Sequence, residues 1–141
     1  MSPRAAFRLL EPIAVRWADV DQMGHVNNAK YFTYCESARM SYFAAIDLER
    51  HRLERQGPAL VAATLNFRQQ VHWPAALEVG VRTAEVGRSS FRHEYVLFRA
   101  GGDEVVAEGG GVIAWVDYAA GRAIPLPDGL REAIRRFESG E

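Results

Sequence analysis

The sequence has one cysteine, one lysine and no long apolar run. Because Cys35 stands alone among 141 residues, the chain can form no internal disulfide and no site built from several cysteines. No hydrophobic stretch approaches the length that crosses a bilayer, and residues 1–8 lack the apolar segment of a signal peptide. We therefore expect no membrane span and a cytoplasmic location, where thiols stay reduced.

An excess of charge is also absent. Seventeen basic residues oppose eighteen acidic ones, so the net charge is -1 and nothing indicates a nucleic-acid partner. All basic residues except Lys30 are arginines, which can grip phosphate in a bidentate way. There is no internal repeat, low-complexity tract or linker. The length fits a single domain over residues 1–141 that buries a sizeable core.

Alternating apolar residues predict strands in five segments. The first holds Ile13, Val15 and Trp17. The other four lie around residues 61–67, from 77 to near 87, at 91–99 and at 105–117. Short turns join the last three, which predicts antiparallel pairing. Three glycines at 109–111 predict a bulge or a close approach of two backbones.

Spacings of three and four predict helices at two places. From Ala29 to about Asp47 the apolar stripe consists of Tyr31, Tyr34, Cys35, Ala38, Tyr42 and Ile46. A short C-terminal helix starts around Asp128, with Leu130, Ile134 and Phe137 on one face. The predicted fold class is α+β, in which a curved five-stranded antiparallel sheet wraps around one long central helix, with the short helix added at the end.

Polar groups gather directly before the long helix, in the segment that contains Asp21, His25, Asn27 and Asn28. The first backbone N–H groups of a helix are unpaired and carry partial positive charge. They can polarise a thioester carbonyl and stabilise the oxyanion that forms on it. A nearby carboxylate can attack that carbonyl or activate a water molecule. Because a thiolate leaves readily, no Ser-His-Asp triad is required.

This segment resembles the 4-hydroxybenzoyl-CoA thioesterase-like hotdog family, in the branch that reads Asp-x-x-x-His-Val-Asn-Asn-x-x-Tyr. It is also similar to the corresponding segment of plant acyl-carrier-protein thioesterases. The resemblance covers nearly the whole chain. Its further matches are Tyr34, Glu36, Ala38 and Arg39 in the helix, Pro74, the turn 87–91, Val116-Asp117 and the segment 124–127. The resemblance implies the hotdog fold and thioesterase activity.

The same resemblance implies a role for each site residue. The expected catalytic residues are Asp21, His25 and Asn28. The expected substrate- and CoA-binding residues are Tyr31, Arg88, Ser89 and Ser90. Asp21 falls where the family places its nucleophile or general base, and Asn28 falls near the thioester carbonyl. Arg88 falls where the family contacts the phosphates or pantetheine arm of CoA. Met23 replaces an asparagine of the plant enzymes, so a mechanism that needs that amide is excluded.

Several of these residues also have a structural interpretation that involves no catalysis or binding. Asp21 could be a turn residue, and Asp19 is expected to hydrogen-bond the loop backbone. His25 serves either as an acid or base or as a residue that shapes the loop. Capping explains one of the two asparagines, Asn27 and Asn28. Arg88 could equally be a solvated charge on a turn.

Other candidates carry less weight. Cys35 is expected to be an inert buried residue. Glu36 is the alternative carboxylate, because a second hotdog thioesterase lineage places its carboxylate on the helix. The remaining histidines, His51, His72 and His93, show no metal-ligand spacing. We therefore expect no metal, and no cofactor other than the CoA of the substrate.

The predicted function is hydrolysis of an acyl-CoA or acyl-carrier-protein thioester, with an aliphatic acyl group favoured. Exposed sheet edges predict a homodimer or homotetramer. One rival function is a hotdog hydratase or dehydratase acting on acyl thioesters, although the histidine motif of those enzymes is not found. The other is a module that binds acyl thioesters without hydrolysing them, since a fold does not fix a function.

Overall fold

The computed structural model describes residues 3–141, which form strands, two α-helices and three short 3₁₀ helices. In chain order these are η1 (Pro3–Ala6), β1 (Leu9–Ala14), η2 (Trp17–Asp19), α1 (Asn28–Ala45), η3 (Leu48–His51), β2 (Gln56–Phe67), β3 (Ala76–Val86), β4 (Ser90–Arg99), β5 (Val105–Asp117), β6 (Arg122–Ala123) and α2 (Asp128–Ser139).

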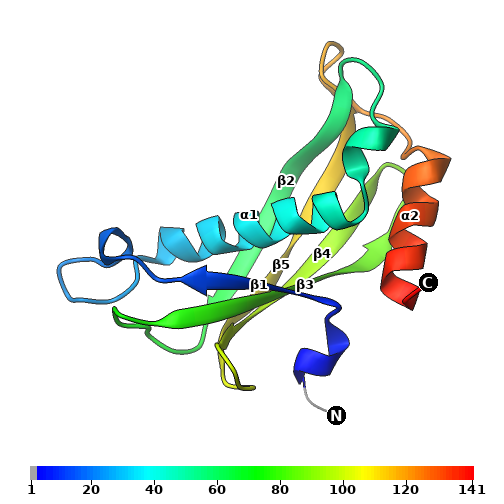
Figure 1. Cartoon of the computed structure of the whole chain (residues 1–141). Coiled ribbons are helices and arrows are strands. Elements are labelled where there is room, and N and C mark those ends of the chain that lie inside the picture. The colour runs from blue at the N-terminus through cyan, green and yellow to red at the C-terminus, as the bar shows by residue number, and fades with distance from the viewer. Residues whose placement is uncertain (1–2) are drawn as a thin grey trace.

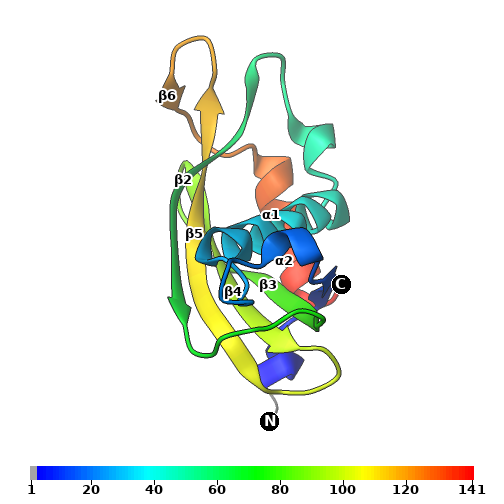
Figure 2. The same ribbon diagram turned by 90° about the vertical axis from the view of Figure 1, so that its left-hand side faces the viewer.

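The strands form one antiparallel sheet in the order β1-β3-β4-β5-β2. The two-residue strand β6 pairs with the end of β5 and adds a strand that the sequence did not predict. The sheet curves around α1, as the two ribbon views show (Figures 1 and 2). Between the sheet and α1 lies the apolar core. The arrangement confirms the predicted α+β hotdog class.

The first strand lies earlier in the chain than predicted. β1 ends at Ala14, and Trp17 begins the 3₁₀ turn η2 instead of continuing the strand. The cause is Asp19, whose side chain accepts a hydrogen bond from the backbone N–H of Arg16 at 3.0 Å. That bond closes a turn and leaves Trp17 70% exposed, so the alternation of apolar residues misplaced this strand.

The long helix matches its prediction closely. α1 begins at Asn28, one residue before the expected start, and Asn27 caps it by accepting a hydrogen bond from the Ala29 N–H at 3.0 Å. All six residues of the predicted apolar stripe are buried. Arg39 lies among them and is only 7% exposed, which no apolar pattern predicts.

The three glycines of β5 allow neighbouring strands to approach closely. Of the two features predicted for them, a bulge or a close backbone approach, the structure has the second. A Cβ on Gly109 would collide with the carbonyl oxygen of Thr64 on β2. A Cβ on Gly110 would lie 2.6 Å from the carbonyl oxygen of His93 on β4. The bulge in this pair of strands lies elsewhere, at Val61 of β2 between Leu60 and Ala62.

The C-terminal helix also begins at the predicted Asp128. Leu130 and Ile134 are buried, and Phe137 packs edge-on against Tyr42 of α1 at 5.1 Å between ring centroids. The helix ends at Ser139, and Gly140, with a positive φ of 83°, gives the usual left-handed C-terminal cap. Neither α1 nor α2 is long and apolar enough to span a bilayer, and no other helix of residues 3–141 is.

Candidate active site

The polar loop between η2 and α1 is tied to the segment that precedes β3. Val20 and Val26 form a β-bridge across the base of the loop. The N–H of Val26 donates to the carbonyl of Val71 at 2.8 Å, and His25 forms a second bridge with His72. These backbone bonds fix the loop beside the N-terminus of α1.

Asp19 holds the beginning of this loop against the helix. Its carboxylate is 1% exposed and accepts hydrogen bonds from the Arg16 side chain at 2.9 Å and the Tyr34 hydroxyl at 2.8 Å. Burial alone would raise the pKa of Asp19, but the bonds from Arg16 and Tyr34 outweigh it and lower that pKa below its ordinary value. The expected bond from Asp19 to the loop backbone is present, at the Arg16 N–H.

Asp21 has a different environment, because it is exposed and only one of its carboxylate oxygens is engaged. Oδ1 accepts hydrogen bonds from the backbone N–H groups of Met23 at 2.9 Å and His25 at 3.2 Å. Oδ2 has no partner among residues 3–141. The turn therefore fixes the carboxylate in place and leaves one oxygen available for chemistry.

The start of α1 offers one unpaired donor. The Ala29 N–H donates to the Asn27 side chain, and the Lys30 N–H donates to the Asn27 carbonyl at 2.8 Å. The Asn28 N–H has no partner in the part of the chain that the structure describes. Asn27 thus accounts for capping, and Asn28 is left with a free backbone donor at the positive end of the helix.

A pocket of about 390 Å³ brings the motif residues together. Its lining consists of Asp21, His25, Val26, Asn28, Tyr31, Phe67, Arg68, Gln69 and Gln70. Four of the residues predicted from the sequence are therefore neighbours in space. Tyr31 forms the inner wall, where it is 2% exposed and burial raises its pKa. It is thus a neutral phenol at neutral pH.

Residues outside the motif form the rest of this pocket. They are Phe67, the last residue of β2, and the three residues that follow it. Beside the pocket, the ring of His72 lies against that of His25 at 4.6 Å between centroids. No spacing in the sequence connects His72 with the motif. Its proximity depends on how the segment before β3 folds back, which no local pattern indicates.

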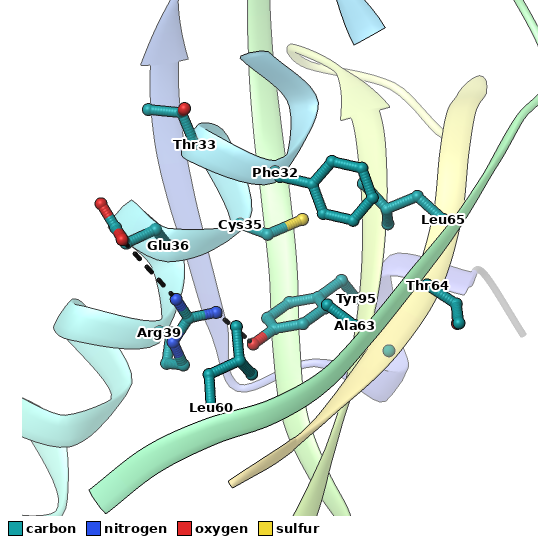
Figure 3. A pocket seen from close by; sticks show the side chains of 11 residues that line it. Phe32, Thr33, Cys35, Glu36, Arg39, Leu60, Ala63, Thr64, Leu65 and Tyr95 are labelled. Atoms are coloured by element: carbon teal, nitrogen blue, oxygen red, sulfur yellow. Dashed lines mark hydrogen bonds and ion pairs between the residues drawn. The ribbon is translucent and has the colours of Figure 1, made fainter. Parts of the chain in front are cut away.

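A second pocket of about 170 Å³ lies farther along α1, between the helix and β2 (Figure 3). It contains the two other candidates, Cys35 and Glu36. Burial raises the pKa of the Cys35 thiol to about 12, so the thiol is protonated and suits the expected inert role. The Glu36 side chain is 64% exposed, and it forms an ion pair with Arg39 at 3.9 Å. Glu36 lies about 12 Å along α1 from Asn28, at 1.5 Å per residue.

Arg88, Ser89 and Ser90 lie away from the motif pocket in the same chain. They follow β3, whereas the polar loop contacts the segment before β3, where the Val26 N–H donates to the Val71 carbonyl at 2.8 Å. The length of β3 separates the two places by roughly 30 Å, at about 3.3 Å per residue. The Arg88 side chain is exposed and has no partner within residues 3–141.

Among residues 3–141 there is no group of three or more His, Cys, Asp or Glu side chains placed to hold a metal ion. The His25–His72 pair supplies two imidazoles, but no third side chain of these types completes a ligand set with them in the described residues.

Comparison with known proteins identifies a family and similar sequences. The model of the thioesterase-like superfamily matches residues 15–134. The chain is 25% identical over 127 residues to the chloroplastic acyl-acyl carrier protein thioesterase ATL3 of Arabidopsis thaliana, an alignment that covers 89% of this chain and 66% of that protein. The chain thus spans just under two thirds of the length of that relative.

The chain also resembles solved structures. A thioesterase of Thermus thermophilus, crystallised with coenzyme A and Zn, superposes with a TM-score of 0.82 at 35% identity, covering 95% of this chain and 97% of that one. The 1,4-dihydroxy-2-naphthoyl-CoA thioesterase Slr0204 of Synechocystis superposes with a TM-score of 0.81 over 90% of this chain and 95% of that one. Its identity is 20%, so this second likeness concerns the fold alone.

Proposed function

The chain belongs to the thioesterase-like superfamily and is a thioester hydrolase, and from that premise we propose that it hydrolyses acyl-CoA to a free acid and the CoA thiol, as one domain over residues 1–141. The proposal rests on one observation. The same pocket holds the free Oδ2 of Asp21 and the unpaired N–H of Asn28. The relative from T. thermophilus, which was crystallised with coenzyme A, supports CoA as the carrier.

In the proposed reaction the thioester carbonyl oxygen accepts a hydrogen bond from the Asn28 N–H. The partial positive charge at the start of α1 stabilises the negative charge that develops on this oxygen. Asp21 then acts as nucleophile or general base: its free oxygen attacks the carbonyl carbon, or removes a proton from a water molecule that attacks it. The carbon–sulfur bond breaks, and the thiolate leaves and takes up a proton. On the general-base route the attacking water supplies the new oxygen of the acid. On the nucleophilic route a mixed anhydride of the acyl group with Asp21 forms, and water then hydrolyses it to the free acid and the Asp21 carboxylate.

His25 and Tyr31 complete the pocket in this proposal. The His25 backbone N–H fixes the Asp21 carboxylate, while its ring forms part of the wall beside His72. Tyr31 gives the acyl group an aromatic surface, since its ring also contacts Phe67 at 5.2 Å between centroids. Neither role requires a metal ion.

We propose that CoA bound at one Asp21 meets Arg88, Ser89 and Ser90 of a second copy. About thirteen bonds join the sulfur of CoA to its first phosphate, which span roughly 17 Å at about 1.3 Å per bond. That arm is shorter than the roughly 30 Å that β3 places between the two regions of one chain. This difference in length favours a contact of the diphosphate with Arg88 of a second copy.

The edge strand β2 offers the surface for such a pairing. β2 is the last strand of the sheet, so within residues 3–141 its edge that faces away from β5 pairs with no other strand. Three of its apolar residues, Leu60, Val61 and Phe67, are 43%, 61% and 40% exposed. Two copies of β2 running antiparallel would bring the Arg88 end of one copy beside the Asp21 end of the other. The sheet would be continuous across a twofold axis, and the exposed edge would be covered. A homodimer, alone or within a tetramer, is the assembly that we propose.

A thiol-release assay over aliphatic and aromatic acyl-CoAs and acyl carrier proteins tests the function. We expect thiol release that persists in EDTA, a pointed control because the T. thermophilus relative was crystallised with Zn. Binding without thiol release would show a binding module, and addition or loss of water on the acyl chain would show a hydratase. Either result would overturn the proposal. The single, buried thiol is compatible with the proposed cytoplasmic location.

A further inference from the structure

The pocket beside Cys35 contains a buried positive charge that the proposed hydrolysis does not use. Arg39 is 7% exposed, and its guanidinium lies at one end of the pocket, with Phe32 and Leu65 toward the other (Figure 3). Its partners within residues 3–141 are the Tyr95 hydroxyl, to which Nη1 donates at 3.2 Å, and the carboxylate of Glu36 at 3.9 Å. A guanidinium has five N–H donors, so most of its hydrogen-bonding capacity is unused.

Within the described part of the chain, no buried group in contact with this guanidinium carries a negative charge. Burial raises the pKa of Tyr95, so its phenol is neutral, and the Cys35 thiol is protonated for the same reason. Burial and the charge of Arg39 lower the pKa of His93 to about 3, so that imidazole, 3.3 Å from the Tyr95 hydroxyl, is neutral too. Among residues 3–141 the anion that contacts Arg39 is the largely exposed Glu36. A buried charge with so little compensation is costly, unless a ligand supplies oxygen acceptors.

The pocket lies next to the proposed catalytic site. Tyr31 lines the first pocket and Phe32 the second, and the ring of Phe67 contacts both, at 5.2 Å and 6.5 Å between centroids. The two pockets therefore lie next to each other along α1 and β2, with the Phe67 ring between them, and we call the two together the trough. Apart from Arg39 and Glu36, its second half is mostly apolar, with walls from Leu60, Ala63 and Leu65.

We propose that this trough holds the acyl chain and that Arg39, with Tyr95, binds an oxygen atom on that chain far from the thioester. The inference rests on the proposed thioesterase function and names its substrate class: acyl thioesters that carry a hydroxyl, keto or carboxyl oxygen near the distal end of an aliphatic chain. Arg39 donates hydrogen bonds to that oxygen, and the apolar walls contact the methylene groups between.

The helix geometry sets the chain length. Arg39 lies eleven residues after Asn28, about 16 Å along α1, and its side chain leans back toward the N-terminus. An extended acyl chain advances about 1.3 Å per carbon, so roughly ten to twelve carbons reach from the Asn28 N–H to the guanidinium.

The test compares three matched substrates in the thiol-release assay: dodecanoyl-CoA, ω-hydroxydodecanoyl-CoA and the monothioester of dodecanedioic acid with CoA, with the ten-carbon series alongside. For the wild-type protein we expect kcat/KM about tenfold higher for one or both oxygenated chains, a difference equal to about 1.4 kcal/mol and within the range for a hydrogen bond to a charged group. The better of the two identifies the oxygen function.

Two variants and a control test whether Arg39 and Tyr95 cause the preference for oxygenated chains. Arg39→Met keeps the length of the side chain but removes the charge, and the oxygenated-to-plain ratio should fall to one or below. Tyr95→Phe leaves the guanidinium in place and should reduce the ratio only partly. Arg92→Met makes the same change at an exposed arginine of β4 that lies outside the trough, and should keep the wild-type ratio.

The outcomes separate the inference from the function on which it rests. Thiol release with equal kcat/KM for plain and oxygenated chains in the wild type, or a preference that survives Arg39→Met, overturns the inference alone. Equal losses on all substrates in Arg39→Met, with a change in oligomeric mass, also overturn it, because Arg39 would then pair with a second copy. No thiol release from any acyl-CoA overturns the proposed function and this inference together.

Discussion

At the scale of single residues, two carboxylates two positions apart in the sequence have opposite environments. Asp19 is buried and fully hydrogen-bonded, whereas Asp21 is exposed and keeps one oxygen free. The local backbone explains the difference, since the turn at Arg16 points Asp19 toward Tyr34. A buried acceptor of several hydrogen bonds holds the loop, while the exposed one is available to a substrate.

Asp19 should therefore contribute stability that depends on pH. Its folded-state pKa lies below the ordinary value of 3.8, so its contribution is complete above that pH and is lost as the pH falls through the lowered pKa. Asp19→Asn should lower the free energy of unfolding at pH 7 by about 2 kcal/mol. Urea unfolding at pH 7 and near pH 3 should show this deficit shrinking in acid.

The control for that measurement is Tyr34→Phe, which removes one of the hydrogen bonds to Asp19. It should cost about 1 kcal/mol at neutral pH. An Asp19→Asn protein as stable as the wild type at pH 7 would show that Asp19 does not hold the loop.

The sequence predicted some site residues and missed others, for physical reasons. Asp21, His25, Asn28 and Tyr31 are close in sequence to one helix start, and the structure places them in one pocket. His72 enters through a segment that is distant in the sequence. Arg39 was not part of the predicted apolar stripe because it is charged, and only three-dimensional packing reveals that it is buried beside it.

At the scale of elements, the two asparagines at the start of α1 have different roles. Asn27→Ala removes the helix cap and should lower the free energy of unfolding by about 1 kcal/mol. Asn28→Ala is the matched control, because its side chain makes no capping bond. That variant should unfold like the wild type but lose about tenfold in kcat, since an amide beside the developing oxyanion is removed while the backbone donor stays. Thermal unfolding and thiol release measured on both proteins check the division, and reversed effects would contradict it.

The contact between β5 and β2 gives a second prediction at this scale. Gly109→Ala would place a methyl group against the Thr64 carbonyl and should cost about 2 kcal/mol, because backbone cannot move aside as a side chain does. Gly102→Ala is the control, since a Cβ there meets nothing within 4 Å. Equal melting temperatures for the two variants would show that β2 yields easily.

Most elements followed from the sequence because their periodicity is strong. Both α-helices and the strands β3, β4 and β5 lie close to their predicted positions, whereas β2 begins at Gln56, five residues before the segment predicted for it. The first strand was misplaced because a side-chain hydrogen bond from Asp19 competes with strand pairing. The two-residue β6 has too few residues to show any alternation.

At the scale of the whole molecule, the account requires two copies for one substrate. A mixture of Asp21→Asn and Arg88→Ala proteins, dissociated and reassembled, tests this directly. Mixed dimers would contain one site with both Asp21 and Arg88 intact. Below KM, activity should rise severalfold over the sum of the separate proteins, since Arg88→Ala raises KM several-fold through a loss of about 1 kcal/mol.

A truncated acyl-pantetheine substrate is the control for this complementation, because it lacks the phosphates that Arg88 would bind. It should show no gain on mixing. No gain with acyl-CoA either, in a mixture shown to contain mixed dimers, would place Arg88 outside the site of the second copy.

The central claim is that Asp21 drives thioester hydrolysis, and the turnover of Asp21→Asn tests it most directly. Asparagine keeps the Oδ1 acceptor for the Met23 and His25 N–H groups, so the loop stays folded while the charge is lost. With the fold verified by circular dichroism, kcat for thiol release from acyl-CoA should fall by about a hundredfold or more. A folded variant with near wild-type kcat would contradict the account and make Glu36 the first carboxylate to examine.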